Sequence, residues 1–200
     1  ELEGIADEAY RMVGLDVERP NITRLIRAHL GPDAIMRGPR PIASPAALVR
    51  VDGKWRIYLA SSLPPLYAHF AKAHEFAHWL VDHFALVVQD EERAADYLGG
   101  ALQAPRTAFR GARRAFGEDL CEIARTFGMT QTGAALRLGE VEHHPLAVVA
   151  PTTVRVRGPE EWVWPSEATL RGWARSGAPG LRKVHLSDDS RRVLLVSDAS

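Results

Sequence analysis

The sequence lacks long apolar runs. No stretch approaches the roughly 18 consecutive apolar residues that a membrane-spanning helix needs, so we expect no membrane partner. Cysteine is nearly missing as well: Cys121 is the only one in 200 residues, which excludes an internal disulfide framework and favours a cytoplasmic location. We interpret Cys121, which lies in an apolar-periodic stretch, as an inert and partly buried thiol. The first residues also lack the basic-then-apolar pattern of a signal peptide.

An excess of charge of one sign is also absent. The 25 Lys and Arg residues balance the 25 Asp and Glu residues, so whole-chain electrostatics favours neither nucleic acid nor a membrane surface as a partner. Any basic patch must therefore be local. The apolar fraction of 46% is that of an ordinary globular protein, which has enough apolar surface to build a core.

Residue periodicity predicts an α+β chain in three segments: 1–105, 106–145 and 146–200. In the first segment, Asp52-Gly53 between two apolar runs predicts a hairpin. The expected elements there are helices over 2–14, 21–30, 66–84 and 91–102 and strands over 47–51 and 55–59. The second segment is expected to be helical. The third is expected to form a small strand-rich subdomain, with strands over 153–156 and 192–196 and a helix over 166–175 capped by Ser166.

The pattern His-Glu-x-x-His lies within the longest predicted helix. At about 100° per residue, His74 and His78 fall on one side of that helix, one turn apart, where both imidazoles can reach one Zn²⁺. Glu75 projects beside them, where its carboxylate can take a proton from metal-bound water without binding the metal. A histidine pair can also form a solvated helix face. The one-sided apolar pattern of this helix favours the metal site.

A second predicted helix supplies a third ligand. Glu92 and Asp96 are four residues apart and share a face, with Gly99 and Gly100 close to the same side, where small residues let two helices approach. Glu92 completes a set of two histidines and one carboxylate with an open position, which is the catalytic rather than the structural zinc pattern. The alternative for an acidic residue in a first turn is to complement the helix dipole, and we assign that role to Glu91.

Two carboxylates are predicted to accept the second ring N–H of the ligand histidines and so to orient them. Asp96 is one candidate. Asp82, which follows His78 by one turn, is the other. His69 and His83 project away from this direction and are excluded as ligands.

These residues resemble the ImmA/IrrE family of metallo-endopeptidases. The family pattern is a Phe shortly before H-E-x-x-H, followed by an acidic helix with Glu-x-x-x-Asn/Asp that ends in small and apolar residues and Pro. The matching residues here are Phe70, His74, Glu75, His78, Glu92, Asp96 and Pro105. The likeness covers about residues 55–140. Two departures, Gly99-Gly100 for the usual alanines and Gln103-Ala104 for an apolar pair, affect helix packing and leave the ligands in place.

The resemblance implies a zincin-like core, in which an active-site helix lies beneath a small antiparallel sheet and Zn²⁺ is the cofactor. It also implies a cytoplasmic hydrolase that cleaves a DNA-binding repressor or a related transcription regulator, often in stress responses. Family members commonly carry a helix-turn-helix-like segment after the core. Residues 123–130, with Ala124 and Gly128 four apart and Thr130 able to cap the next helix, fit such a segment.

We therefore expect a zinc-dependent endopeptidase that acts on a protein substrate, with Glu75 as general base. In zincins an edge strand pairs with an extended substrate, and the strand that contains Trp55, Ile57 and Leu59 is our candidate. The alternative is a DNA-binding or sensory regulator with a structural or vestigial zinc site. Its local positive charge would come from Arg106, Arg110, Arg113 and Arg114, for which a scaffolding helix is favoured over DNA contact. A third reading makes residues 151–200 a partner-binding element.

Overall fold

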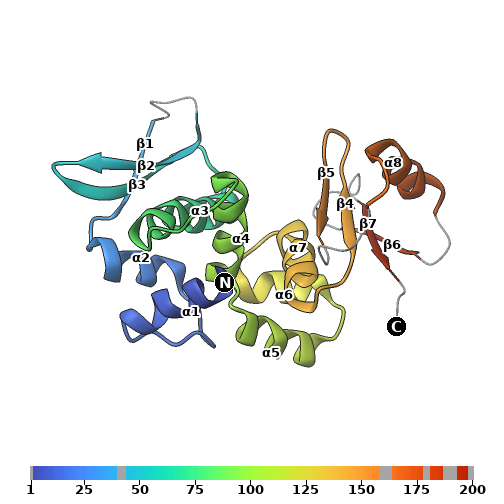
Figure 1. The fold of residues 1–200 in the computed structure, drawn as a ribbon, viewed down its shortest axis with the longest axis horizontal. Helices are drawn as coiled ribbons and strands as arrows, with labels where there is room; N and C mark the ends of the chain where they lie inside the picture. Colours follow the sequence, from blue (N-terminus) through green and yellow to red (C-terminus); the bar gives the residue numbers. More distant parts are fainter. Residues whose placement is uncertain (1, 40–43, 158–163, 178–180, 187–192, 198–200) are drawn as a thin grey trace. The chain divides into compact units, whose positions relative to one another are not determined.

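The protein is described by a computed structural model that covers residues 2–39, 44–157, 164–177, 181–186 and 193–197 (Figure 1). The chain forms two units, which are described separately. Unit 1 contains Glu1–Ala115 and Phe127–Met129, and unit 2 contains Phe116–Thr126 and Thr130–Ser200. The division therefore falls within the segment 106–145 that the sequence suggested as a separate helical piece.

Unit 1 begins with two helices, α1 (Leu2–Met12) and α2 (Ile22–Leu30). The side chain of Asn21 caps α2 by accepting a hydrogen bond from the N–H of Arg24, as expected for an Asn at a helix start. Both helices turn an apolar stripe inward, and the innermost positions are fully buried. These are Ala6, Ala9, Tyr10, Leu25 and Ile26.

The sheet of unit 1 has the strand order β1-β3-β2, with β1 (Ile35–Gly38), β2 (Ala46–Val51) and β3 (Lys54–Ala60). The predicted hairpin between β2 and β3 is confirmed. Its turn residues Asp52 and Gly53 both have positive φ, 49° and 76°, as the tightest hairpin turns require. The sequence analysis missed β1, which pairs in parallel with β3. The sheet is therefore mixed, which corrects our expectation of an antiparallel sheet.

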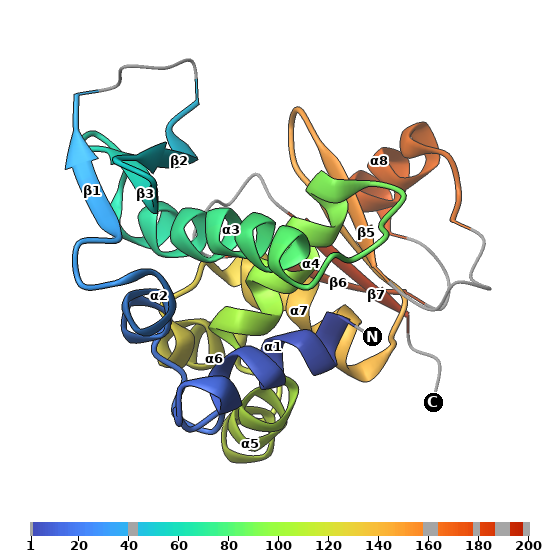
Figure 2. The same ribbon diagram turned by 60° about the vertical axis from the view of Figure 1, so that its left-hand side comes forward.

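Three helices complete unit 1: α3 (Pro65–His83), α4 (Glu91–Gln103) and α5 (Arg106–Phe116). α3 packs against β2 and β3 and is crossed by α4 (Figure 2). Its inner face buries Phe76 and Leu80, which belong to the same apolar core as Ile57 of β3. α1 is tied to α4 by the hydroxyl of Tyr10, which donates to the carbonyl of Leu102 at 2.8 Å.

Unit 2 is built on an antiparallel sheet of order β5-β4-β7-β6. Its elements are α6 (Leu120–Phe127), α7 (Gln131–Glu142), β4 (Leu146–Val149), β5 (Val154–Arg157), α8 (Glu167–Ser176), β6 (Leu181–His185) and β7 (Val193–Ser197). The strands expected near 154 and 194 and the Ser166 cap are confirmed, although Arg192 lies outside the described residues. β4 and β6 were not expected.

A buried ion cluster joins α7 to β5. Glu140 accepts from Arg157 at 2.7 Å and contacts Arg137 at 3.4 Å, and Arg137 is only 1% exposed. Burial raises the pKa of Glu140, and the two guanidinium groups act in the opposite direction. Because a buried charge is costly unless it is paired, this cluster fixes how α7 lies on the sheet. None of the described helices combines the length and the apolar character that crossing a membrane requires.

Candidate metal centre

α4 approaches α3 most closely at Gly99. A Cβ atom placed on Gly99 would lie 3.1 Å from the backbone N and 3.2 Å from the Cα of His74. Because these are backbone atoms of a packed helix, they cannot move aside as the end of a flexible side chain can. The absence of a side chain at Gly99 therefore allows the two helices to touch at the first histidine of the motif.

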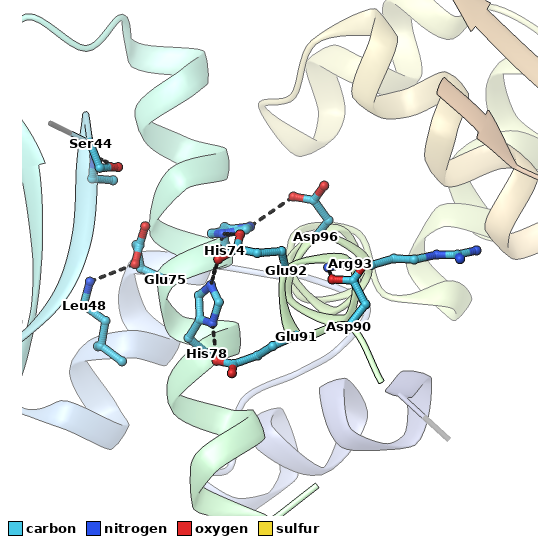
Figure 3. A network of polar contacts seen from close by, with 11 residues as sticks. Ser44, Leu48, His74, Glu75, His78, Asp90, Glu91, Glu92, Arg93 and Asp96 are labelled. Carbon is cyan, nitrogen blue, oxygen red and sulfur yellow. Dashed lines mark hydrogen bonds and ion pairs between the residues drawn. The ribbon is translucent and has the colours of Figure 1, made fainter. Parts of the chain in front are cut away.

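This contact brings three predicted ligands together (Figure 3). His74 and His78 of α3 and Glu92 from the first turn of α4 each offer one atom, and these atoms lie within 4.8 Å of one another. The two Nε2 atoms are 3.2 Å apart. Nε2 of His74 is 3.3 Å from Oε2 of Glu92, and Nε2 of His78 is 3.5 Å from Oε1.

The size and chemistry of this group fit a zinc ion. Two ligand atoms that are each about 2.0–2.1 Å from a tetrahedral Zn²⁺ are roughly 3.3–3.4 Å apart. The separation of 3.2 Å between the two Nε2 atoms and the distances of 3.3 and 3.5 Å from each of them to one of the two Glu92 oxygens are all close to that value. Imidazole nitrogen and carboxylate oxygen are also suitable zinc donors. The imidazole side chains are 17% exposed and the Glu92 side chain 77%, so the group opens to solvent on the α4 side.

Each histidine has a carboxylate partner on its other ring nitrogen. Nδ1 of His74 is 3.1 Å from Oδ1 of Asp96, and Nδ1 of His78 is 2.7 Å from Oε1 of Glu91. A proton on Nδ1 satisfies each carboxylate and leaves the Nε2 lone pair of each ring available to a metal. The contacts outside the ligand group thus select the tautomer that the proposed ligand role requires.

The partner of His78 differs from our prediction. We expected Asp82 to accept the spare N–H of His78 and assigned Glu91 to the helix dipole, but the structure places Glu91 at that nitrogen. The reason is the direction of helical side chains, which lean toward the N-terminus of their helix. The His78 ring therefore leans toward His74 and the start of α4, away from Asp82. The signal for Glu91 was its position beside Glu92, in the first turn of the helix that supplies the third ligand.

The carboxylates around His74 alter its protonation. Burial alone would lower the pKa of His74, but the hydrogen bond to Asp96 and the charges of Asp96, Glu75 and Glu92 outweigh that effect and raise it. His69, which we excluded as a ligand, differs: burial, together with the charge of Lys72, lowers its pKa to about 4.

Glu75 lies on the side of α3 that faces β2 (Figure 3), and its Oε2 accepts a hydrogen bond from the backbone N–H of Leu48 at 2.8 Å. The strand beside the predicted general base is therefore β2. Our candidate for substrate pairing, the strand with Trp55, Ile57 and Leu59, is wrong because β3 is paired on both sides. The unexpected strand β1 takes the edge that we had assumed to be free.

Other residues considered from the sequence lie elsewhere. The ring of His83 stacks on Trp79 at 4.4 Å. Cys121 is exposed, which corrects our expectation of a partly buried thiol.

Replacing Gly99 by alanine tests whether the close helix contact supports the centre. The added methyl group overpacks the α3–α4 contact, whereas Gly111 of α5 has nothing within 4 Å of its Cβ position and provides a matched control. We expect Gly99→Ala to be less stable than Gly111→Ala by about 1–3 kcal/mol, measured by chemical denaturation, and to bind zinc more weakly. Equal stability and zinc affinity of the two variants would contradict the assigned role of Gly99.

The carboxylate that orients His78 can be identified with a pair of variants. We expect Glu91→Gln to weaken zinc binding by roughly 10- to 100-fold, the usual cost of losing a partner of a ligand histidine. Asp82→Asn should leave zinc affinity unchanged. Competition with a chelator measures both, and the opposite ranking would restore our original interpretation of Asp82.

The raised pKa of His74 predicts a pH dependence. In the metal-free protein, the folded state favours the protonated form of His74 more than the unfolded state does, so protonation of His74 stabilises the fold. This contribution is fully present below the ordinary pKa of about 6.5. It is lost as pH rises through the higher pKa of the folded state. Zinc binding requires the neutral ring and should therefore strengthen over the same range. Asp96→Asn should reduce this dependence of metal-free stability, as measured by Tm against pH, because Asp96 contributes the largest of the effects that raise the pKa of His74. An unchanged profile in that variant would count against the assignment to Asp96.

Comparison with known proteins gives the fold and the family. Among the curated proteins compared, none matches the chain. A solved structure of a Mycobacterium tuberculosis transcriptional regulator is similar with a TM-score of 0.65 and 15% identity, over 98% of this chain and 87% of that one, which shows a shared fold. Residues 39–138, half of the chain, match the peptidase family M78, described as the IrrE N-terminal-like domain, and include the whole three-residue group. The chain therefore belongs to the IrrE N-terminal-like family of metallopeptidases, in agreement with the resemblance seen in its sequence.

Proposed function

We propose that this protein is a zinc-dependent endopeptidase whose metal ligands are His74, His78 and Glu92. The observation that carries the proposal is that the two Nε2 atoms lie 3.2 Å apart and that each lies 3.3 or 3.5 Å from an oxygen of Glu92, close to the separation of two ligand atoms on a tetrahedral Zn²⁺. Membership of a metallopeptidase family agrees with it. With three protein ligands, one coordination position remains for the reaction.

The residues of the chain have distinct roles in this proposal. When bound, Zn²⁺ lowers the pKa of a water ligand to about 7 and polarises the scissile carbonyl. Glu75 accepts the proton that the attacking water loses and later delivers it to the leaving amine. Asp96 and Glu91 hold the two imidazoles in orientation. The outer edge of β2, which pairs with no other strand among the described residues and lies next to Glu75, is our revised candidate for pairing with an extended substrate.

We further propose that the substrate is a DNA-binding repressor or a related regulator in the cytoplasm. The family resemblance supports this class of substrate. The similar fold of a protein called a transcriptional regulator is consistent with a role in transcription. An exposed lone thiol at Cys121 suits a reducing compartment.

The rival function is DNA binding through α6 and α7. In its favour, Thr130 caps α7 by accepting from the N–H of Gly133, as a helix-turn-helix segment would allow. Against it, Arg137 and Glu140 of α7 are buried with Arg157 and are unavailable to phosphates or bases. Of the four arginines of α5, Arg110 and Arg114 are exposed and Arg106 and Arg113 are half-buried. The peptidase proposal is therefore favoured.

Two variants test the proposed function. We expect the wild-type protein to contain about one zinc ion per chain and His78→Ala to contain little, as measured by elemental analysis. Glu75→Gln should keep its zinc and lose cleavage of a co-expressed repressor from a neighbouring gene by a factor of about 10² or more.

Exposed arginines on α5 provide the control. Replacing Arg110 and Arg114 by alanine should leave cleavage unchanged if the protein is a peptidase, and should abolish its biological effect if it acts by binding DNA. Zinc-free wild-type protein, or a Glu75→Gln variant that keeps full biological activity, would contradict the peptidase proposal.

A further inference from the structure

The orientation of the β2 edge follows from the hydrogen bonds of β3. The N–H of Ile57 donates to the carbonyl of Ala34, on the β1 side, at 2.7 Å. Leu48 lies directly opposite Ile57 in the antiparallel pair. Because Ile57 directs its N–H away from β2, this is a non-hydrogen-bonded pair, and the N–H and C=O of Leu48 point outward from the sheet. Leu48 therefore presents a donor and an acceptor at the free edge of β2.

The outward N–H of Leu48 is occupied by Glu75. The distance of 2.8 Å from this nitrogen to Oε2 is that of a charge-assisted hydrogen bond. Figure 3 shows that the carboxylate of Glu75 is directed toward β2, whereas the imidazoles of the adjacent histidines are directed toward α4. The residue proposed as general base is thus held to the strand, on the side of α3 that faces β2.

An extended peptide that adds to this edge needs the same donor. In a strand pair, the outward N–H and C=O groups of alternate residues bond the incoming chain, and on β2 these residues are Ala46, Leu48 and Arg50. One N–H forms one well-aligned hydrogen bond. A peptide carbonyl that pairs with Leu48 therefore replaces the carboxylate of Glu75.

We propose that the backbone N–H of Leu48 is a positioning group for Glu75, which it holds at the β2 edge until a substrate main chain takes over the hydrogen bond. The exchange frees the carboxylate to turn toward the attacking water when a peptide is in place. This inference rests on the proposed peptidase function and adds regulation of the same site. It couples hydrolysis to edge pairing, so extended segments are favoured over small molecules that reach only the metal.

The test removes the N–H while keeping the strand. Proline is tolerated at edge positions whose N–H points outward, so Leu48→Pro deletes the donor without breaking the ladder to β3. Leu48→Ala is the matched control, because it shortens the same side chain and keeps the N–H. The probe is acetohydroxamic acid, which binds zinc, needs a nearby carboxylate as a hydrogen-bond acceptor, and is too short to pair with β2.

In zinc-loaded protein, we expect Leu48→Pro to bind the probe roughly tenfold more tightly than Leu48→Ala, because Glu75 no longer has to leave a charge-assisted hydrogen bond. Isothermal titration calorimetry measures both dissociation constants. Equal affinities in the two variants overturn the proposal.

A second measurement needs no proline. Amide hydrogen exchange of Leu48 in the metal-free protein should be at least about tenfold faster in Glu75→Ala than in the wild type, while the outward amide of Arg50 should be unchanged. An unprotected Leu48 amide in the wild type overturns the positioning role. The zinc content of the wild-type protein as purified, before the metal is removed, decides the proposed function separately. A protein purified without zinc but with a protected Leu48 amide refutes the peptidase and keeps the Leu48–Glu75 contact.

Discussion

The contact between Gly99 and the backbone of His74 is the constraint on which the candidate metal centre depends. Once the two helices touch there, Asp96 lies against Nδ1 of His74. One turn earlier on α4, Glu92 reaches the Nε2 atoms of both histidines. A single close approach therefore sets several polar contacts that no local sequence preference could set one by one.

The parts of this site that the sequence predicted are those that one helix determines by itself. His74, Glu75 and His78 share a helix, so their relative directions follow from its period. The facing of Glu92 and Asp96 follows in the same way from α4. The pairing of His78 with Glu91 depends on the position of α4 relative to α3. A prediction of the His78 partner from α3 alone led to Asp82. Errors of this kind arise where the packing of two helices determines which of two nearby carboxylates contacts a histidine.

Strand pairing shows the same limit. The hairpin of β2 and β3 was predictable because Asp52-Gly53 joins strands that are adjacent in the chain. β1 has four residues and pairs in parallel across a connection that includes β2, so its sequence carries no comparable signal. In unit 2, the burial of Arg137 depends on Glu140 and on the more distant Arg157. Residue periodicity places an arginine on the surface, and only the assembled unit provides the partners that allow it inside.

The first helix of the chain bears on how this protein should be subdivided. The family likeness begins at residue 39, yet Ala9, Tyr10 and Leu25 of the preceding helices belong to the same core as Phe76 and Leu102. A fragment that starts at residue 39 would lack Tyr10, so the buried carbonyl of Leu102 would lose its hydrogen-bond donor. The apolar side of α4 that packs against α1 would also be exposed to solvent. The stretch that matches the family therefore differs from the folding unit, and an expressed fragment should begin before residue 39.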